Sequence, residues 1–383
     1  MRPLKLGVVV LLLLNLTGCW SKVELDELTF VYGLFIDAGK EPGSVEVTIN
    51  SPLPNRISSA GQPAAGGGNG ATFSTVSKTA NTISDAVMLI QKDLTRKLNL
   101  THLMVVVIGQ PYARQGIGDL LEWIKGEPAI PLGTFIMGSP GSAKELNKLT
   151  PFYEQLPAQV LMNFATEKFM FATTIKDCLF AEASGVGFSI NYLSFGEKED
   201  RSEEDKPEYW AGIQGAMLFH KDTMKGTLKL KEGRALAWAT ARVRYAAYSV
   251  SWDEGRSNAS AVFVSTKSSK DITRTNKDPV FTVKLKGKAS ITYLKDAQNR
   301  SKEELSKIIT EKLSEKLTAN LTDAIRSSQK VGADILQLGL LLEWNDPKAW
   351  KQLNEQWEDY YTNKAEIKVT TDFRIVDFGT AKK

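Results

Sequence analysis

The chain has 383 residues with 48 basic and 44 acidic side chains, which gives a formal charge of +4, and 42% of its residues are hydrophobic. This length predicts two or three domains, and the composition is that of a globular protein with apolar residues enough for true cores. The near-neutral balance excludes nucleic acid as an expected partner. With only two cysteines and two histidines, the chain is a poor candidate for a disulfide framework, a zinc site or a histidine-based triad.

The amino-terminal segment has the pattern of an export signal. Arg2 and Lys5 form a positive head, and an uninterrupted apolar run follows over residues 6–14. A transmembrane helix needs about 20 apolar residues, so this run is too short to span a bilayer. Polar residues follow it directly, which argues against a stop-transfer helix. The segment therefore predicts a secretory signal peptide over residues 1–18.

The end of this signal carries a lipidation motif. Leu16-Thr17-Gly18-Cys19 resembles the bacterial lipobox, in which the cysteine receives a diacylglyceryl group and becomes the new amino terminus. The resemblance implies cleavage after Gly18, followed by S-diacylglycerol and N-acyl attachment (palmitate or a similar chain) at Cys19. Two or more acyl chains anchor a protein stably where a single chain is marginal. The mature chain is thus expected to be attached to the membrane without crossing it.

The mature chain over residues 19–196 is expected to form a mixed α/β domain. Continuous or alternating β-branched runs predict strands, and apolar residues at steps of three and four predict helices. A strand, a helix and a strand over residues 73–109 have the pattern of a βαβ unit. The expected strands cover 29–39, 44–50, 73–78, 102–109, 133–138 and 185–195, and the expected helices cover 79–97, 117–125, 142–149 and 166–182.

Two polar segments interrupt this pattern. Residues 58–71 are rich in glycine and alanine, which predicts a mobile loop. A phosphate-binding loop would end in Gly-Lys-Ser/Thr, but Ala71 is followed by Thr72 and Phe73. Residues 197–208 form a dense charge run, and we interpret it as a linker between domains.

The remaining chain, residues 209–383, is expected to be a second α+β domain that could divide into two subdomains. A largely antiparallel sheet should pack against long carboxy-terminal helices, so the fold class as a whole is α+β and multi-domain. The expected elements are alternating strands and turns over 210–239, with a hairpin turn at 221–226, strands at 245–252, 261–269 and 279–294, a helix over 302–330, one or two helices over 334–361 and a final strand at 365–380.

No motif in the sequence predicts catalysis. Ser327 and Lys330 have the Ser-x-x-Lys spacing of penicillin-recognising enzymes, but they lie at a helix end and the companion motifs are absent. Trp350, Trp357 and Tyr361 share one helical face, which indicates core packing more than a ligand groove.

The second cysteine and the two histidines are also expected to have structural roles. Cys178 lies in an apolar helix, which predicts a buried small hydrophobe. His102 opens an apolar strand, and His220 lies beside a turn. We therefore predict no catalytic, cofactor-binding or metal-binding residue and no cofactor, and we expect a protein that is not an enzyme.

Several stretches, taken in order, resemble one family. After the lipobox come "ELDELTFVYGLFIDAG", "LNLTHLMVVVIGQPYARQGI", "GSAKELNKL", "GAMLFHKDTMKGTL", "EGRALAW", "DILQLG" with two later tryptophans, and "VTTDFRIVDFGT". Together they are similar to the C-subunit lipoproteins of spore germinant receptors, the Ger(x)C type. The resemblance covers nearly the whole mature chain, and the 58–71 segment looks like an insertion.

This resemblance implies a membrane-anchored lipoprotein subunit of a spore germinant receptor, needed for nutrient-triggered germination. It would lie on the outer face of the spore's inner membrane and assemble there with the A-type and B-type membrane subunits. The family brings no catalytic residues, so Cys19 is the one position with an implied role. The alternatives are an extracytoplasmic solute-binding lipoprotein and an envelope hydrolase, which would need a convergent Ser, Asp or Glu cluster that the sequence does not offer.

Overall fold

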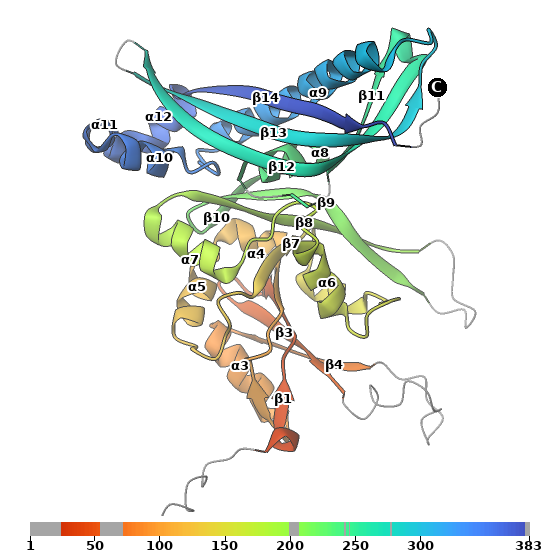
Figure 1. Ribbon diagram of the computed structural model, residues 1–383. Coiled ribbons are helices and arrows are strands. Elements are labelled where there is room, and N and C mark those ends of the chain that lie inside the picture. Colours follow the sequence, from red (N-terminus) through yellow and green to blue (C-terminus); the bar gives the residue numbers. More distant parts are fainter. Residues whose placement is uncertain are drawn as a thin grey trace, which may run out of the picture.

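The computed structural model describes residues 24–53, 72–198, 207–240, 243–244, 246–275 and 278–379. Two lobes lie one above the other in Figure 1: a lower lobe built on an eight-stranded sheet and an upper lobe built on a four-stranded sheet. Helices cover both faces of the lower sheet, whereas the upper sheet curves around long helices. The expected class, a mixed α/β part followed by a sheet packed on carboxy-terminal helices, is confirmed.

The lower sheet is parallel at its centre and antiparallel at both ends. Its strand order is β10-β9-β8-β7-β6-β2-β3-β4, in which β2, β6, β7 and β8 run parallel. A separate two-stranded sheet pairs β1 with β5. The bounds are β1 (Leu28–Phe30), β2 (Gly33–Ala38), β3 (Val45–Pro52), β4 (Phe73–Ala80), β5 (Lys97–Asn99), β6 (Val105–Gly109), β7 (Phe135–Ser139), β8 (Gly187–Glu197), β9 (Tyr209–His220) and β10 (Thr223–Lys229).

The expected hairpin between the first two strands is confirmed, because β2 pairs antiparallel with β3. The expected βαβ unit is wrong in its pairing: β6 lies beside β2, and β4 lies at the edge of the sheet. The reason is burial. All five residues of β6 are buried, as suits a strand between two parallel neighbours, whereas none of the residues of β4 is fully buried.

Helices bury apolar side chains on the two faces of this sheet. One core cluster lies under α3, α4, α5 and α7, and the other lies under η2 and α6. The helix expected over 79–97 is present as the shorter α3, which buries Ile83, Ala86 and Ile90. The bounds are η1 (Leu25–Glu27), α3 (Ile83–Lys92), α4 (Gln110–Gln115), α5 (Gly118–Lys125), η2 (Ala143–Lys148), α6 (Pro157–Thr166) and α7 (Ile175–Ser184).

The helix expected over 166–182 begins later than its apolar pattern indicates. Helix α6 ends at Thr166, Lys168 adopts a left-handed φ of 53°, and α7 starts only at Ile175. A capping box explains this start, because the Thr174 side chain accepts a hydrogen bond from the backbone N–H of Asp177 while the Asp177 carboxylate accepts one from the Thr174 N–H. The segment expected as a helix over 142–149 is the 3-10 helix η2.

The charged segment at 197–208 follows β8 and precedes β9, two strands of the lower sheet. Strands β8 and β9 pair antiparallel from Gly187 opposite His220 to Glu197 opposite Tyr209, so the segment joins two paired strands of one sheet. The lower sheet then continues through β10, past the division that we placed at 197–208. The alternating patterns before and after the charge run are those of two strands that can pair. The charges themselves do not indicate that pairing.

The upper sheet has the order β11-β12-β13-β14. Its first three strands are antiparallel, as expected, but β14 pairs parallel with β13 because α9 to α12 return the chain to the far end of the sheet. The bounds are β11 (Ala246–Trp252), η3 (Asp253–Gly255), β12 (Ser257–Thr275), β13 (Asp278–Lys295) and β14 (Glu366–Asp377).

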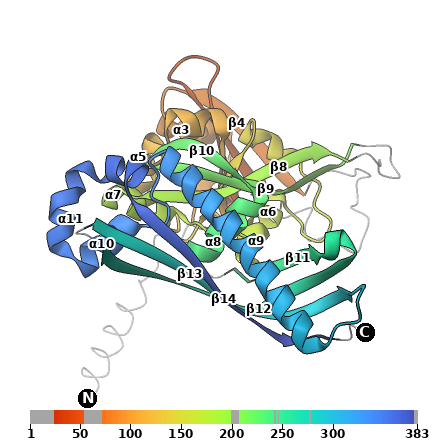
Figure 2. The ribbon, with the colours of Figure 1, turned by 90° about the horizontal axis from the view of Figure 1, so that it is seen from above.

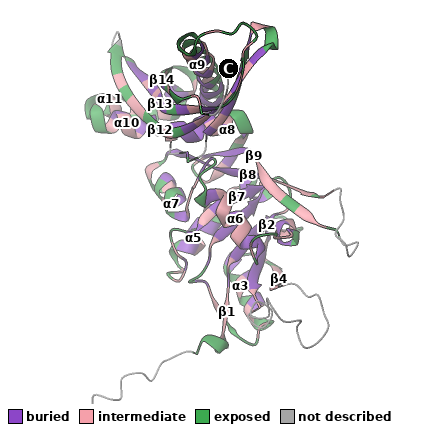
Figure 3. Ribbon diagram, turned by 45° about the vertical axis from the view of Figure 1, so that its right-hand side comes forward, coloured by how far each residue is buried: buried purple, intermediate pink, exposed green. Residues whose placement is uncertain are grey.

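Helix α8 (Leu230–Thr240) replaces the last part of the strands and turns expected over 210–239, so that expectation is wrong. Alternate alanines and leucines can be read as a strand, but α8 buries Ala235, Leu236, Ala237 and Trp238 together. It lies between the two lobes, where Gly233 approaches the side chain of Ala216 in β9. Figure 3 shows the buried residues of both sheets and of α8 between them.

The expected long helix is confirmed as α9 (Lys302–Lys330), which crosses the upper lobe in Figure 2. A capping box between Ser301 and Glu304 starts it. Helices α10 (Leu338–Asn345), α11 (Pro347–Leu353) and α12 (Trp357–Asn363) follow, with η4 (Asn354–Gln356) between the last two. One core cluster runs from α8 and α9 into the lower lobe, so the two lobes share buried packing. Within the described residues, we found no helix with both the length and the apolar character that crossing a bilayer requires.

Candidate functional site

The loop between α9 and α10 joins the two lobes. It covers residues 331–337 and lies directly against β8, because a Cβ atom added to Gly187 would be 3.0 Å from backbone atoms of Ala333 and Asp334. Two residues of the loop, Gly332 and Gln337, have left-handed φ values of 67° and 55°. The left-handed conformation is unfavourable for a residue other than glycine, so contacts around Gln337 must hold the loop in place.

Asp334 supplies those contacts. Its side chain is 3% exposed, and its carboxylate accepts hydrogen bonds from the N–H groups of Leu338 (3.0 Å) and Gly339 (2.8 Å) and from the indole of Trp357 (3.2 Å). Burial raises the pKa of Asp334, while these donors and the nearby Lys270 ammonium oppose that shift. The Lys270 ammonium itself donates to the Leu336 carbonyl at 2.6 Å.

The aromatic residues of the carboxy-terminal helices complete this junction. The rings of Trp350 and Trp357 lie 5.4 Å apart, and Tyr361 is fully buried with its hydroxyl 2.8 Å from Ser328. The prediction that this face packs in the core is confirmed. The Asp334 carboxylate, the Trp357 indole and the Tyr361 hydroxyl all have hydrogen-bond partners within the chain, so the arrangement is suited to holding the lobes together.

A small hollow opens beside the junction. It has a volume of about 210 Å³ and lies between α7, β8 and the loop before α10. The hydroxyl of Ser189 is buried beside it and forms no hydrogen bond with the described residues. The lining is largely apolar and consists of Phe171, Ala172, Thr173, Asp177, Phe180, Gly187, Phe188, Ser189, Thr240, Ile335 and Gln337.

A second buried carboxylate lies at the carboxyl end of a central strand of the lower sheet. Asp37 is the second-last residue of β2 and accepts hydrogen bonds from the Ser142 hydroxyl (2.8 Å) and from the backbone N–H groups of Ala143 (2.6 Å) and Lys144 (3.0 Å). Burial raises its pKa, and these donors oppose the shift. Ligands of open α/β sheets bind at the carboxyl ends of parallel strands, but here the chain's own carboxylate uses the donors. Asp37 was not predicted from the sequence, although a strand with Asp near its end and a later Ser at a helix start were visible signals.

The histidines and the second cysteine are far apart. His102 is exposed, with its ring 4.8 Å from Phe30, and His220 lies 3.3 Å from the Glu358 carboxylate. Cys178 is a free thiol, fully buried, and burial raises its pKa far above the ordinary value, which confirms the prediction of a buried small hydrophobe. No cluster of three metal-ligating side chains occurs among the described residues. Cys19 and the 58–71 segment lie outside them.

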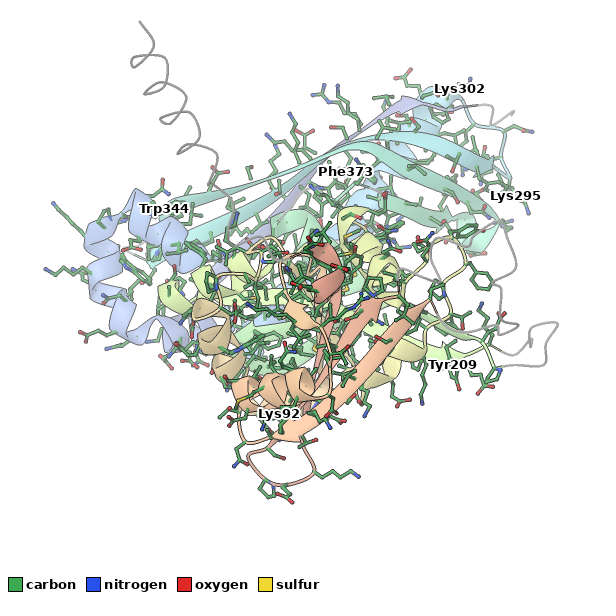
Figure 4. All side chains as sticks on the ribbon, turned by 90° about the horizontal axis from the view of Figure 1, so that it is seen from below. Lys92, Tyr209, Lys295, Lys302, Trp344 and Phe373 are labelled. Carbon is green, nitrogen blue, oxygen red and sulfur yellow. The ribbon has the colours of Figure 1, made fainter. Side chains whose placement is uncertain are left out.

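Exposed aromatic side chains gather at the outer end of β8 and β9. Phe152 is 65% exposed, Tyr153 is 98% exposed, and Trp210 is 44% exposed. The Thr150 N–H donates to the Tyr209 carbonyl and the Tyr209 N–H donates to the Thr150 hydroxyl, which attaches the loop of Phe152 and Tyr153 to β9. The Lys198 ammonium lies 3.3 Å from the centre of the Phe152 ring. Figure 4 shows Tyr209 at the side of the molecule, away from the centre of the lower sheet. We call Phe152, Tyr153 and Trp210 the aromatic surface.

Comparisons with known proteins cover both lobes. A family model described as "Spore germination protein N-terminal domain" matches residues 21–194, and one described as "Spore germination B3/ GerAC like, C-terminal" matches residues 214–379.

Curated relatives and one solved structure agree with these matches. In Bacillus subtilis (strain 168), the putative spore germination protein YfkR is 22% identical over 92% of this chain and 91% of its own, and spore germination protein B3 is 23% identical over 99% of each. Spore germination protein KC is 20% identical over 98% of this chain and 95% of its own. The crystal structure of the GerBC protein has a similar fold, with a TM-score of 0.57 at 18% identity over 93% of this chain and 100% of that one.

Proposed function

Since the chain belongs to the Ger(x)C family of germinant-receptor C subunits, we propose that it acts as the membrane-anchored lipoprotein subunit of such a receptor and is needed for nutrient-triggered germination. The observation that carries this proposal is that the family matches extend over both lobes in the right order, behind an amino-terminal lipobox. The receptor would lie on the outer face of the spore's inner membrane.

The length of the tether supports a position close to that membrane. Strand β1 begins at Leu28, only nine positions after Cys19. A fully extended chain spans at most about 3.5 Å per residue, so the start of β1 would stay within about 30 Å of the lipid. A short tether of this kind favours lasting contact with membrane subunits in the same bilayer.

We propose that the chain assembles with the A-type and B-type membrane subunits by protein–protein contact, and that the aromatic surface takes part. Exposed aromatic side chains are enriched in protein interfaces, where they often carry much of the binding energy. The substitutions Tyr153→Ser and Trp210→Ser should reduce co-purification of the membrane subunits from spore membranes. The exposed residues Leu132 and Met88 are suitable control positions. Unchanged co-purification in the aromatic variants would remove this surface from the proposal.

Substitution of the lipidation residue tests the anchoring step. Cys19→Ala should release the chain from the membrane fraction and lower germination by nutrients, while germination by non-nutrient routes continues. Cys178→Ala is the matched control, because that thiol is buried in α7 and is not expected to carry lipid. A detached Cys19→Ala protein with a normal nutrient response would contradict the anchoring role. Deletion of the gene, scored against separate nutrients, tests the receptor role itself.

A solute-binding lipoprotein is the second candidate, favoured by the hollow that Ser189 lines, beside which the Ser189 hydroxyl is buried without a hydrogen bond to the described residues. A ligand that binds only the folded state raises the melting temperature, by an amount set by its concentration relative to Kd. A panel of small nutrients should therefore raise the melting temperature of the isolated mature chain, and filling the hollow with Ala172→Phe should abolish the shift. An unchanged melting temperature across the panel would count against this candidate.

A further inference from the structure

The outer face of the upper sheet carries basic side chains that no described carboxylate neutralises. Lys267 in β12, Lys286 and Lys288 in β13, and Arg374 in β14 are exposed. None of them forms an ion pair with another described residue. We call these four residues the basic face.

The orientation of these side chains follows from the glycine between two of them. A Cβ atom added to Gly287 would contact Phe263 and lie 3.1 Å from the Trp238 ring, so position 287 faces the core. Successive side chains of a strand point to opposite faces, so Lys286 and Lys288 point away from the core. Lys267 and Arg374 are their direct cross-strand partners and share that face.

The register places like charges directly opposite each other. Lys267 faces Lys286, and Lys288 faces Arg374. Such pairs destabilise a sheet, whereas opposite charges at these positions would stabilise it. The neighbouring lysines do have partners: Lys284 lies 3.4 Å from Asp372, and Lys368 lies 3.1 Å from Glu366. Asp372 lies opposite Lys286 but forms its ion pair with Lys284, so the four residues of the basic face form no ion pair with a described carboxylate and an external anion would relieve their repulsion.

The shape and the apolar residues of this surface indicate what kind of molecule carries the anionic group. A shallow depression of about 240 Å³ is lined by all four basic residues together with Ser265, Gly287 and Asp372. Next to it, Val264 is 63% exposed and Val376 is 52% exposed. Basic side chains with exposed apolar neighbours on an open surface match the layered chemistry of a bilayer, in which phosphates lie above acyl chains.

We propose that the basic face binds the headgroup layer of a bilayer that contains anionic phospholipids. The lysine and arginine side chains would contact lipid phosphates, and the two valines would reach the boundary with the acyl chains. All four residues are exposed and point away from the side of the sheet that packs on Trp238 and Phe263, so the described chain leaves the basic face open to solvent. This contact does not need the lipid at Cys19, so it can be tested, and can fail, independently of the proposed anchoring.

Vesicle binding by the unlipidated mature chain tests the proposal. Residues 1–19 are removed, which leaves every described residue in place. The chain should float with mixed phosphatidylglycerol–phosphatidylcholine vesicles and not with phosphatidylcholine alone, and binding should weaken in high salt. Each basic contact changes the partition coefficient between vesicle and buffer about fivefold. Substitution of all four residues with Gln should therefore lower this coefficient by a factor of at least about 100. Charge reversal to Glu should abolish binding.

A matched variant controls for net charge. Lys92, Lys176, Lys225 and Lys231 are exposed and lie outside the upper sheet, and α3 with Lys92 is at the opposite end of the molecule from β13 (Figure 1). Their reversal to Glu changes the net charge equally and should leave most vesicle binding intact. The Gln variant should match or exceed the parent's urea midpoint, because it removes like-charge pairs from exposed positions, and the other variants should stay close to that midpoint.

Two results would overturn the proposal. The first is parent binding that does not depend on anionic lipid, or that falls equally in both sets of variants. The second is a basic face whose neutralisation leaves vesicle binding unchanged but prevents co-purification of receptor membrane subunits in detergent. That outcome would assign the surface to an acidic protein partner.

Discussion

Asp334→Ala is the substitution with the sharpest expected effect. It would leave three buried donors, the N–H groups of Leu338 and Gly339 and the indole of Trp357, without an acceptor. Each unsatisfied buried group costs about 1–3 kcal/mol before the structure relaxes. The partly buried Lys270 ammonium would also lose the attraction of this nearby carboxylate. Because the two penalties overlap, we expect a loss of about 3–5 kcal/mol in the free energy of unfolding.

Urea denaturation of the mature chain, followed by tryptophan fluorescence, measures this loss. Asp323→Ala is the control, because that carboxylate is exposed on α9 and its distance to Arg326 is 3.9 Å. It should change stability by less than about 0.5 kcal/mol. Adding Lys270→Met to Asp334→Ala should cost less than the sum of the single changes, by about 0.5–3 kcal/mol. If Asp334→Ala costs no more than the exposed control, Asp334 does not hold the junction.

Three further predictions concern other parts of the fold. The Arg300 guanidinium donates a hydrogen bond to Asp253 at 2.8 Å and lowers the pKa of the Asp253 carboxyl. The stabilisation is therefore present above the usual aspartate pKa of about 4 and is lost as the pH falls below it. The difference in the free energy of unfolding between the parent and Arg300→Gln should shrink in an acid titration. Gly187→Ala should cost about 1–3 kcal/mol in a urea melt, and Gly141→Ala, with open space around it, much less. Cys178 in the unlipidated chain should react with a thiol reagent only after unfolding, so rapid labelling in buffer would contradict its burial.

Elements with a local periodic signal were predictable. The four-residue spacing of leucine and isoleucine in α9 coincides with its buried stripe, and the capping box of Ser301 and Glu304 marks its start. In β6, a continuous apolar run predicted a strand buried on both faces, as observed. These signals lie within one element and do not depend on how the chain folds back on itself.

Features set by contacts between distant segments were not predictable. Helix α8 is apolar on nearly all sides because it lies between two sheets, so its sequence has no amphipathic period to read. Likewise, Asp37 bonds to residues more than 100 positions away, and Lys270 donates to Leu336 across 66 positions. No spacing rule connects such residues, so the buried carboxylates were missing from the predicted site. The parallel pairing of β14 has the same cause, since three helices separate it from α9.

Satisfaction of polar groups separates structural from functional surfaces in this chain. Asp334 and Asp37 are buried charges, yet each already has three donors within the chain, so they stabilise the fold and leave little capacity for a ligand. The basic face shows the opposite pattern: the register brings Lys267 to Lys286 and Lys288 to Arg374, and none of the four forms an ion pair with a described carboxylate. Positions that break a local stability rule without compensation inside the fold are where function is expected. By this criterion a spore germination protein of this family is expected to meet its surroundings at its sheet surfaces, with the junction holding the two lobes in register beneath them.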